Sequence, residues 1–261
     1  MHELILATSF WLPKNLSAHG GDIDRLIGML HWFMAALFVG WGIYFVFCLV
    51  RFRQRSGHTA TYQLIKAKPS KYLEIAVVLI EAALLLWFSM PVWAEYRNEP
   101  PPPDSDRLEI RIVAQQFAWN IHYSGPDGEF GATRPELVDE TLNPIGLDKD
   151  GDPAAADDVV TINELTIPVD RDVYLRLTSK DVIHSLWLPK LRIKQDIVPG
   201  MEIPVWFKAV EVGKMDIACA QLCGLGHYRM RGECQILPKA EFEQWYATAG
   251  VEEEFEEDED D

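Results

Sequence analysis

Cysteine is scarce in this chain, with four thiols in 261 residues. So few cannot form the dense disulfide framework of a small secreted domain. No Cys-x-x-Cys-His occurs, which excludes a covalently attached c-type haem. The first 25 residues lack a basic segment followed by a cleavable apolar core, so we predict no signal peptide. Basic residues are the minority, 24 against 40 acidic, and the net charge of -16 argues against a nucleic-acid partner.

Charge is nearly absent from two long stretches. Residues 26–50 contain no charged side chain, and residues 75–94 contain only Glu81. Each stretch is long enough to cross about 30 Å of hydrocarbon at about 1.5 Å per residue. We therefore predict a transmembrane hairpin over residues 26–98, preceded by a short outer segment, residues 1–25. A pair of buried core helices is the alternative.

The loop between the two spans, residues 51–71, lacks acidic residues altogether and contains six basic ones. By the positive-inside rule this loop is cytoplasmic. Both ends of the chain then lie on the opposite side of the membrane.

The second half of the chain lacks a helical period between Pro103 and Pro238. A proline-rich linker, residues 99–106, leads out of the membrane. After it apolar residues alternate with polar ones, as in residues 108–112. Later strand-like runs cover residues 173–177, 203–207 and 233–237. These short strands predict an all-β sandwich or barrel over residues 107–245.

Acidic residues are concentrated in two segments. Residues 127–172 hold thirteen acids and three basic residues, and residues 252–261 hold nine acids in ten. The run Asp148-Lys-Asp-Gly-Asp152 is similar to the start of a calcium loop, but the downstream Glu and flanking helices of an EF-hand are missing. We expect an acidic, solvated insertion over residues 127–172 and a disordered acidic tail over residues 246–261.

The richest motif is Cys219-Ala-Gln-Leu-Cys223-Gly-Leu-Gly-His227-Tyr-Arg-Met230. Thiolate and thioether ligands select copper(I), and imidazole also suits copper. A mononuclear blue-copper site needs one Cys, so two Cys in one loop suggest two metals bridged by two sulfurs. A disulfide between Cys219 and Cys223 is the alternative, but it leaves His227 and Met230 unexplained.

Two predicted spans, a β-rich outer domain and this loop together resemble subunit II of the haem–copper cytochrome c oxidases. The resemblance covers nearly the whole chain. It also includes Asp181-Val-Ile-His184-Ser-Leu-Trp-Leu-Pro189, Lys194-Gln-Asp196 and Pro199-Gly200. It implies a membrane-anchored α+β protein whose outer domain is a cupredoxin-like Greek-key barrel.

The resemblance also implies a dinuclear copper centre, called CuA in the family. Its ligands would be His184, Cys219, the backbone carbonyl of Gln221, Cys223, His227 and Met230. Cytochrome c or a similar donor would deliver electrons, and haem in subunit I would receive them for oxygen reduction coupled to proton pumping. The other implied partners are subunit III and the membrane. The implied location is a bacterial inner membrane with the copper domain on the periplasmic side.

Two positions depart from the family pattern. Gln221 stands where many members have a Glu whose side chain reaches an interface magnesium, and a neutral amide is a poorer ligand for that hard cation. Phe117 stands where the family commonly has the Trp that receives the electron. Trp119 and Tyr123 are the other candidates for that role, and we interpret Phe117 as a packing residue.

The second span contains two acids seven residues apart, Glu74 and Glu81. That spacing places them about 20° apart on one helical face. Glu74 aligns with a family Glu at the mouth of a proton pathway, so we expect it to help protons enter. An acid within a span should face protein or water, and our hypothesis is that Glu81 contacts subunit I.

Four other classes of protein share part of this pattern. A quinol oxidase subunit shares the fold but lacks the copper ligands, and a nitrous oxide reductase shares the copper motif but lacks a membrane hairpin. A membrane-anchored copper carrier or assembly factor would need an exposed, exchangeable site. A structural membrane protein with an incidental disulfide would bind no copper.

Overall fold

The computed structural model describes residues 12–57, 59, 62 and 68–249. Most of the predicted acidic tail therefore lies outside the described residues. The described chain forms two compact units. One contains residues 22–98, and the other combines residues 13–21 with residues 99–249.

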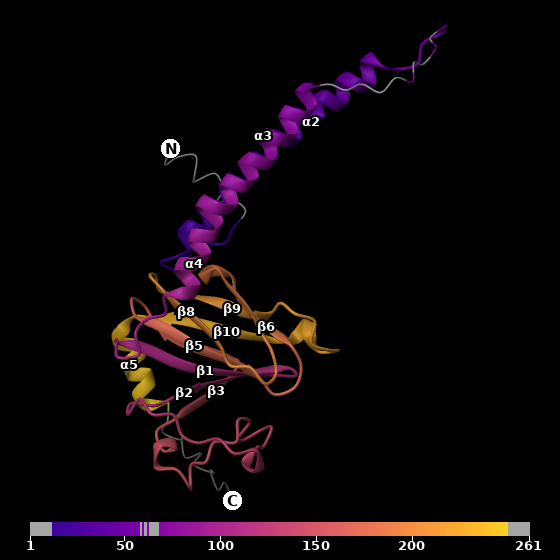
Figure 1. Ribbon diagram of the computed structural model, residues 1–261. Coiled ribbons are helices and arrows are strands. Elements are labelled where there is room, and N and C mark those ends of the chain that lie inside the picture. Colours follow the sequence, from indigo (N-terminus) through magenta and orange to yellow (C-terminus); the bar gives the residue numbers. More distant parts are fainter. Residues whose placement is uncertain (1–11, 58, 60–61, 63–67, 250–261) are drawn as a thin grey trace, which may run out of the picture. The chain divides into compact units, whose positions relative to one another are not determined.

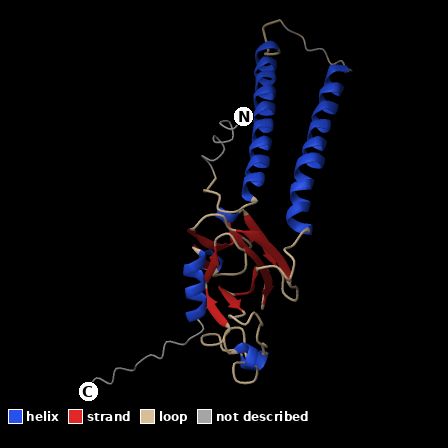
Figure 2. Ribbon diagram, turned by 90° about the vertical axis from the view of Figure 1, so that its left-hand side faces the viewer, coloured by secondary structure: helices blue, strands red, loops and turns tan. Residues whose placement is uncertain are grey.

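The first unit is a pair of long apolar helices (Figure 2). Helix α2 covers Gly20–Arg51, and the second helix runs through α3 (Lys68–Leu84), a π-helical turn (Leu85–Ser89) and α4 (Met90–Asn98). Both are long and apolar enough to cross a membrane. No described side chain of α3 or α4 is buried. The core-helix alternative would require a buried face, so membrane spans account better for these helices.

Both helices extend beyond the predicted spans of residues 26–50 and 75–94. The start of α2 is set by polar contacts just before it. The Ser17 hydroxyl accepts a hydrogen bond from Gly20 N at 3.0 Å, and the Asn15 side chain accepts one from Ser17 N at 3.0 Å. These contacts satisfy a backbone donor that a helix start leaves free. The predicted outer segment, residues 1–25, is therefore too long at its C-terminal end.

The second unit is a sandwich of two five-stranded sheets (Figure 1). The strands are β1 (Arg107–Gln115), β2 (Ala118–Tyr123), β3 (Val159–Ile162), β4 (Glu164–Pro168), β5 (Asp172–Ser179), β6 (His184–Leu188), β7 (Ile193–Ile197), β8 (Ile203–Lys208), β9 (Gly213–Cys219) and β10 (Arg231–Leu237). One sheet has the order β3-β2-β1-β5-β8, and the other has the order β4-β10-β9-β6-β7.

The predicted alternation is confirmed in β1 and also occurs in β5. In β1 every second residue is buried, including Leu108, Ile110 and Ile112. Such side chains from both sheets meet in one core. The pairs β1–β5 and β10–β4 are parallel although neither pair is consecutive in sequence, so the chain crosses between strands as in a cupredoxin-like domain. The predicted fold class is confirmed.

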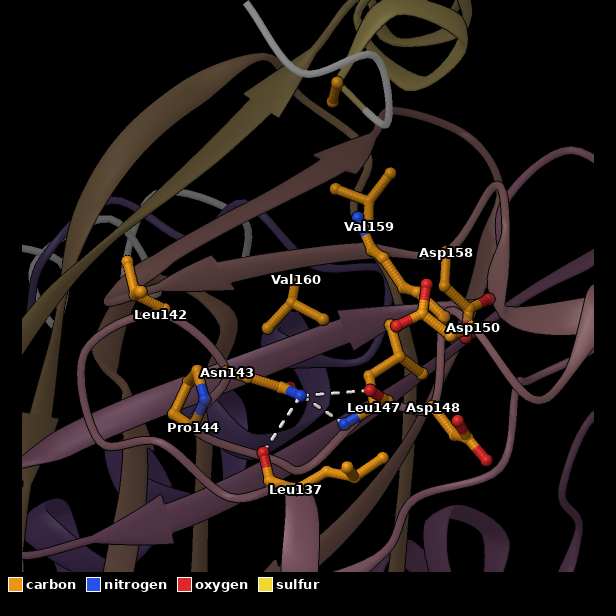
Figure 3. A pocket seen from close by; sticks show the side chains of 12 residues that line it. Leu137, Leu142, Asn143, Pro144, Leu147, Asp148, Asp150, Asp158, Val159 and Val160 are labelled. Carbon is orange, nitrogen blue, oxygen red and sulfur yellow. Dashed lines mark hydrogen bonds between the residues drawn. The ribbon is translucent and has the colours of Figure 1, made fainter.

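The acidic insertion is folded rather than a solvated loop, and this expectation was wrong. Its C-terminal part forms β3 and β4, and Ile145, Leu147 and Ala155 form a small core of their own. Asn143 lines a pocket of about 480 Å³ (Figure 3). Its amide donates hydrogen bonds to the carbonyls of Leu137 at 3.1 Å and Leu147 at 3.0 Å. In this lobe the Asn143 side chain makes backbone hydrogen bonds of the kind that strand pairing makes in a sheet.

The carboxylates of the calcium-like run also hold the lobe together. Asp148 forms an ion pair with Arg134 at 2.6 Å, and Asp152 accepts a hydrogen bond from Ala132 N at 2.8 Å. These oxygens satisfy the lobe's own donors.

The domain ends later than the predicted residue 245. Helix α5 (Lys239–Thr248) buries Phe242, and the Tyr246 hydroxyl donates to the Gly125 carbonyl at 2.8 Å. Residues 246–248 therefore belong to the domain and not to the tail. The helix is too short to produce a strong periodic signal in the sequence.

Candidate metal centre

His184 is the first residue of β6, and its ring contacts Asp181, which precedes the strand. Its ring is fully buried, and Nε2 donates a hydrogen bond to Asp181 Oδ1 at 2.9 Å. The other ring nitrogen, Nδ1, is buried without a hydrogen-bond partner. Metal-binding histidines commonly donate one N–H to a carboxylate, which leaves the second nitrogen for the metal. His184 has this arrangement.

Two cysteines lie beside that free nitrogen. Cys219 is the last residue of β9, and Cys223 follows in the loop. Their sulfurs are 3.8 Å apart, and the possible ligand atoms of His184, Cys219 and Cys223 all lie within 4.8 Å of one another. Both thiols are free, so the disulfide alternative is wrong.

The remaining predicted ligands surround the cysteines. Cys223 Sγ is 3.6 Å from His227 Nδ1 and 3.7 Å from Met230 Sδ. The carbonyl oxygen of Gln221 is 3.1 Å from Cys219 Sγ. The structure thus brings together all six groups that the sequence singled out, from β6, β9 and the loop.

The two thiols differ in acidity. Burial raises the pKa of Cys219, but the neighbouring His184 ring and hydrogen bonds from the backbone of Gln221 and Ser185 outweigh it and lower that pKa to about 6. Burial and the neighbouring Cys219 charge raise the pKa of Cys223 to about 11. Cys219 is therefore the more acidic of the two thiols, and a bound metal cation would favour the thiolate form of both.

The donor set fits a soft metal. It combines two sulfurs, two imidazoles, a thioether and a carbonyl, and the unpaired Nδ1 of His184 is a buried lone pair that a metal would satisfy. Thiolate and thioether together favour copper. Met230 and Cys223 are buried, so a bound metal would be largely shielded from water.

Phe117 lies directly against the ligand loop. A methyl group added at Gly226 would come within 2.4 Å of its ring. The Arg229 guanidinium lies over the same ring, 5.6 Å from its centroid. Phe117 therefore packs against the loop that carries Cys223 and His227.

The other two aromatic candidates are internal. Trp119 is fully buried, with its ring 6.2 Å from that of His184. Tyr123 is also fully buried, and its hydroxyl exchanges hydrogen bonds with the backbone of Thr166. Neither ring reaches the surface, so an electron donor that docks on this domain alone would touch neither of them.

Sequence reasoning did not assign roles to Asp181 or Gln116. Asp181 is three residues before a ligand histidine, which is a usable signal. Gln116 donates from Nε2 to the Cys223 carbonyl at 2.6 Å, across more than a hundred residues of sequence, and no local pattern indicates that contact.

Comparison with known proteins identifies the family. The family model described as "Cytochrome C oxidase subunit II, periplasmic domain" matches residues 108–235. "Cytochrome c oxidase subunit 2" of Thermostichus vulcanus is 44% identical over 273 residues, covering 93% of this chain and 81% of that protein. "Alternative cytochrome c oxidase subunit 2" of Bradyrhizobium diazoefficiens is 31% identical over 237 residues, covering 90% of this chain and 82% of that protein. The resemblance seen in the sequence is confirmed: the chain belongs to the subunit II family of the haem–copper cytochrome c oxidases.

Proposed function

We propose that this chain is the electron-accepting subunit of its oxidase, holding a two-copper CuA centre outside the membrane. The observation that supports this is the convergence of His184, Cys219 and Cys223 within 4.8 Å, with His227 and Met230 beside them. When bound, the copper pair takes up and releases one electron at a time. The electrons would pass to haem in subunit I, where oxygen reduction and proton pumping take place.

The chain's own residues supply three requirements for that role. The sulfurs of Cys219 and Cys223 lie 3.8 Å apart, and both would hold the copper pair. Asp181 fixes the orientation of the His184 ring. Met230, whose Sδ lies 3.7 Å from Cys223 Sγ, is buried and would hold the copper pair from the interior of the domain.

We further propose that electrons reach the centre through Phe117. It is the one aromatic candidate of the three whose ring is only partly buried, and it lies against the ligand loop. The chain's net charge of -16 would attract a basic donor such as cytochrome c. Gln221 lacks a carboxylate, so the proposed centre offers a poorer magnesium ligand at that position.

In the membrane unit, Glu74 and Glu81 both lie on α3, two helical turns apart. We propose Glu74 as a proton-entrance residue and Glu81 as a contact to subunit I. We also propose subunit III as a partner and a bacterial inner membrane as the location. We also propose three parts for the described chain. They are a membrane hairpin predicted at residues 26–98 that begins at Gly20 with α2, a linker at residues 99–106, and an outer domain predicted at residues 107–245 that ends at Thr248 with α5.

The test is to purify the full chain in its oxidase and measure metal content and low-temperature electron paramagnetic resonance. Two coppers per chain with a mixed-valence spectrum are expected, and Cys223→Ser should abolish that spectrum. Cys234→Ser is the matched control, because Cys234 is buried in β10, away from the loop. One copper, or zinc, would contradict the proposal. Rapid copper loss to a mild chelator would instead indicate a copper carrier.

A further inference from the structure

Gln116 lies in the turn between β1 and β2, a segment that contributes no predicted metal ligand. Its side-chain Nε2 donates a hydrogen bond to the carbonyl of Cys223 at 2.6 Å. Its backbone N–H donates to Asp181 Oδ2 at 2.7 Å. One residue is therefore bonded both to the ligand loop and to the turn that precedes His184.

The second of these bonds continues to a ligand. The other oxygen of Asp181, Oδ1, accepts hydrogen bonds from His184 Nε2 at 2.9 Å and from Val182 N at 2.7 Å. Gln116 and His184 thus share the two oxygens of one carboxylate. A shift of Gln116 would move the acceptor that orients the His184 ring.

The hydrogen bond from Gln116 Nε2 to the Cys223 carbonyl lies beyond the part of the chain that strand pairing stabilises. Strand pairing joins Leu186 of β6 to Cys219 of β9, and Ala220 N still donates to the Ser185 carbonyl at 2.9 Å. Cys223 lies three residues further on, in the loop. The Gln116 amide thus restrains Cys223, whereas strand pairing restrains Cys219.

The fit between Gln116 and the loop is tight. A methyl group added at Gly224 would lie 2.6 Å from Gln116 Nε2, and the φ of +135° at Gly224 favours glycine. Phe117, the next residue, covers Gly226. The Gln116 amide therefore lies directly against Gly224, although the residue as a whole is exposed.

We propose that Gln116 is a positioning residue of the metal centre, which fixes Cys223 relative to His184 through the Cys223 carbonyl and Asp181. The inference rests on the proposed function and deepens it. Without the amide donor, the Cys223 peptide can rotate and the ligand set relaxes. The copper pair would then change its spectrum and reduction potential, and would leave the site faster.

The test compares Gln116→Glu and Gln116→Met with wild type in the purified oxidase. Both variants keep the length of the side chain and remove the amide donor, one with a charge and one without. Gln115→Glu is the matched control, because the Gln115 amide bonds to Glu140 at 2.7 Å and to Asn120, outside the ligand loop. Copper loss to a chelator should be about tenfold faster in both Gln116 variants and unchanged in the control. The hyperfine pattern and the potential should change with it.

Thermal unfolding of the metal-free proteins separates positioning from stability. The three variants should unfold at similar temperatures while only the Gln116 variants alter the copper spectrum. If wild type holds two coppers and both Gln116 variants match its spectrum, potential and chelation rate, this inference is wrong and the proposed function stands. If wild type holds no copper pair, the proposed function fails, and this inference fails with it.

Discussion

At the scale of single residues, Glu109 on β1 shows how charge is placed on the outer face of a sheet. Its carboxylate accepts hydrogen bonds from Arg107 at 2.8 Å and from Arg176 on the neighbouring β5. Burial raises the pKa of Glu109, but the hydrogen bonds from Arg176 and Arg107 outweigh it, and the pKa lies below its ordinary value of 4.5. The ionised form therefore stabilises the folded domain.

Glu109→Gln should lower the free energy of unfolding by about 1 kcal/mol at pH 7. Because the folded-state pKa is the lower one, this stabilisation is complete above the unfolded pKa and is lost as pH falls through the folded pKa. Wild type and variant should therefore converge under acid conditions. Denaturant titrations followed by tryptophan fluorescence at pH 7 and near pH 3 would measure it.

Glu202→Gln is a suitable comparison, because Glu202 also pairs with Arg176, at 2.7 Å, but is more exposed. Its effect should be smaller, in line with other surface pairs. A Glu109 effect that stays constant across the pH range would contradict the linkage.

At the scale of elements, the ligand loop depends on close contact with the β1–β2 turn. Gly226 has φ of -91°, so an alanine there suffers no backbone strain, and the obstacle is the Phe117 ring. Gly226→Ala should displace the ring or the loop and reduce copper occupancy at least severalfold, measured by metal analysis. Adding Phe117→Ala should restore part of the loss, because it removes the clash. Additive effects of the two changes would show that the contact is unimportant.

The insertion is joined to the sandwich by a buried pair. His122 Nε2 on β2 is 2.6 Å from Asp158 Oδ2, and the same oxygen accepts a hydrogen bond from Gly131 N at 2.8 Å. Both side chains of the pair are almost completely buried. Removing one partner of such a pair leaves the other unsatisfied.

Asp158→Ala should therefore destabilise the outer domain by about 3 kcal/mol and expose the insertion to proteolysis. Limited proteolysis with mass mapping of residues 130–158 would detect it. Asp157→Ala is the control, because the partly buried Asp157 accepts from Asp127 N at the edge of the lobe. Unchanged protease resistance in Asp158→Ala would contradict the role of the pair.

The elements also explain what sequence could predict. Strands such as β1 have a strict period of two, and the spans have long uncharged runs, so both were predictable. The insertion's core uses Ile145, Leu147 and Ala155 without a period, and its turns are held by side-chain hydrogen bonds. The spacing and the resemblance singled out the candidate metal ligands, and the structure places them close together. Their supports were not predictable, because Asp181 and Gln116 act across segments distant in sequence.

At the scale of the whole molecule, the dominant property is the net charge of -16. A charge of this size attracts basic partners over a distance set by the salt concentration. Reduction of the copper centre by a basic cytochrome c should slow about tenfold between about 20 and 200 mM KCl, measured by stopped flow. A small uncharged reductant should show no such dependence. A rate that rises with salt would exclude electrostatic attraction of the donor.

One consequence concerns the order in which this protein can be assembled. Leu16 is buried in the outer domain, exchanging backbone hydrogen bonds with Lys190 at 2.8 Å and Val210 at 2.8 Å. The sandwich therefore includes residues 13–21, which are synthesised before the first span. Its strands are synthesised after the second span. The segment around Leu16 can therefore pack into the outer domain only after the strands of that domain have been synthesised. A soluble fragment that begins at the linker lacks Leu16, so the place that Leu16 fills in the outer domain would be empty. A recombinant outer domain should therefore include residues 13–19, either fused to it or added as a separate peptide.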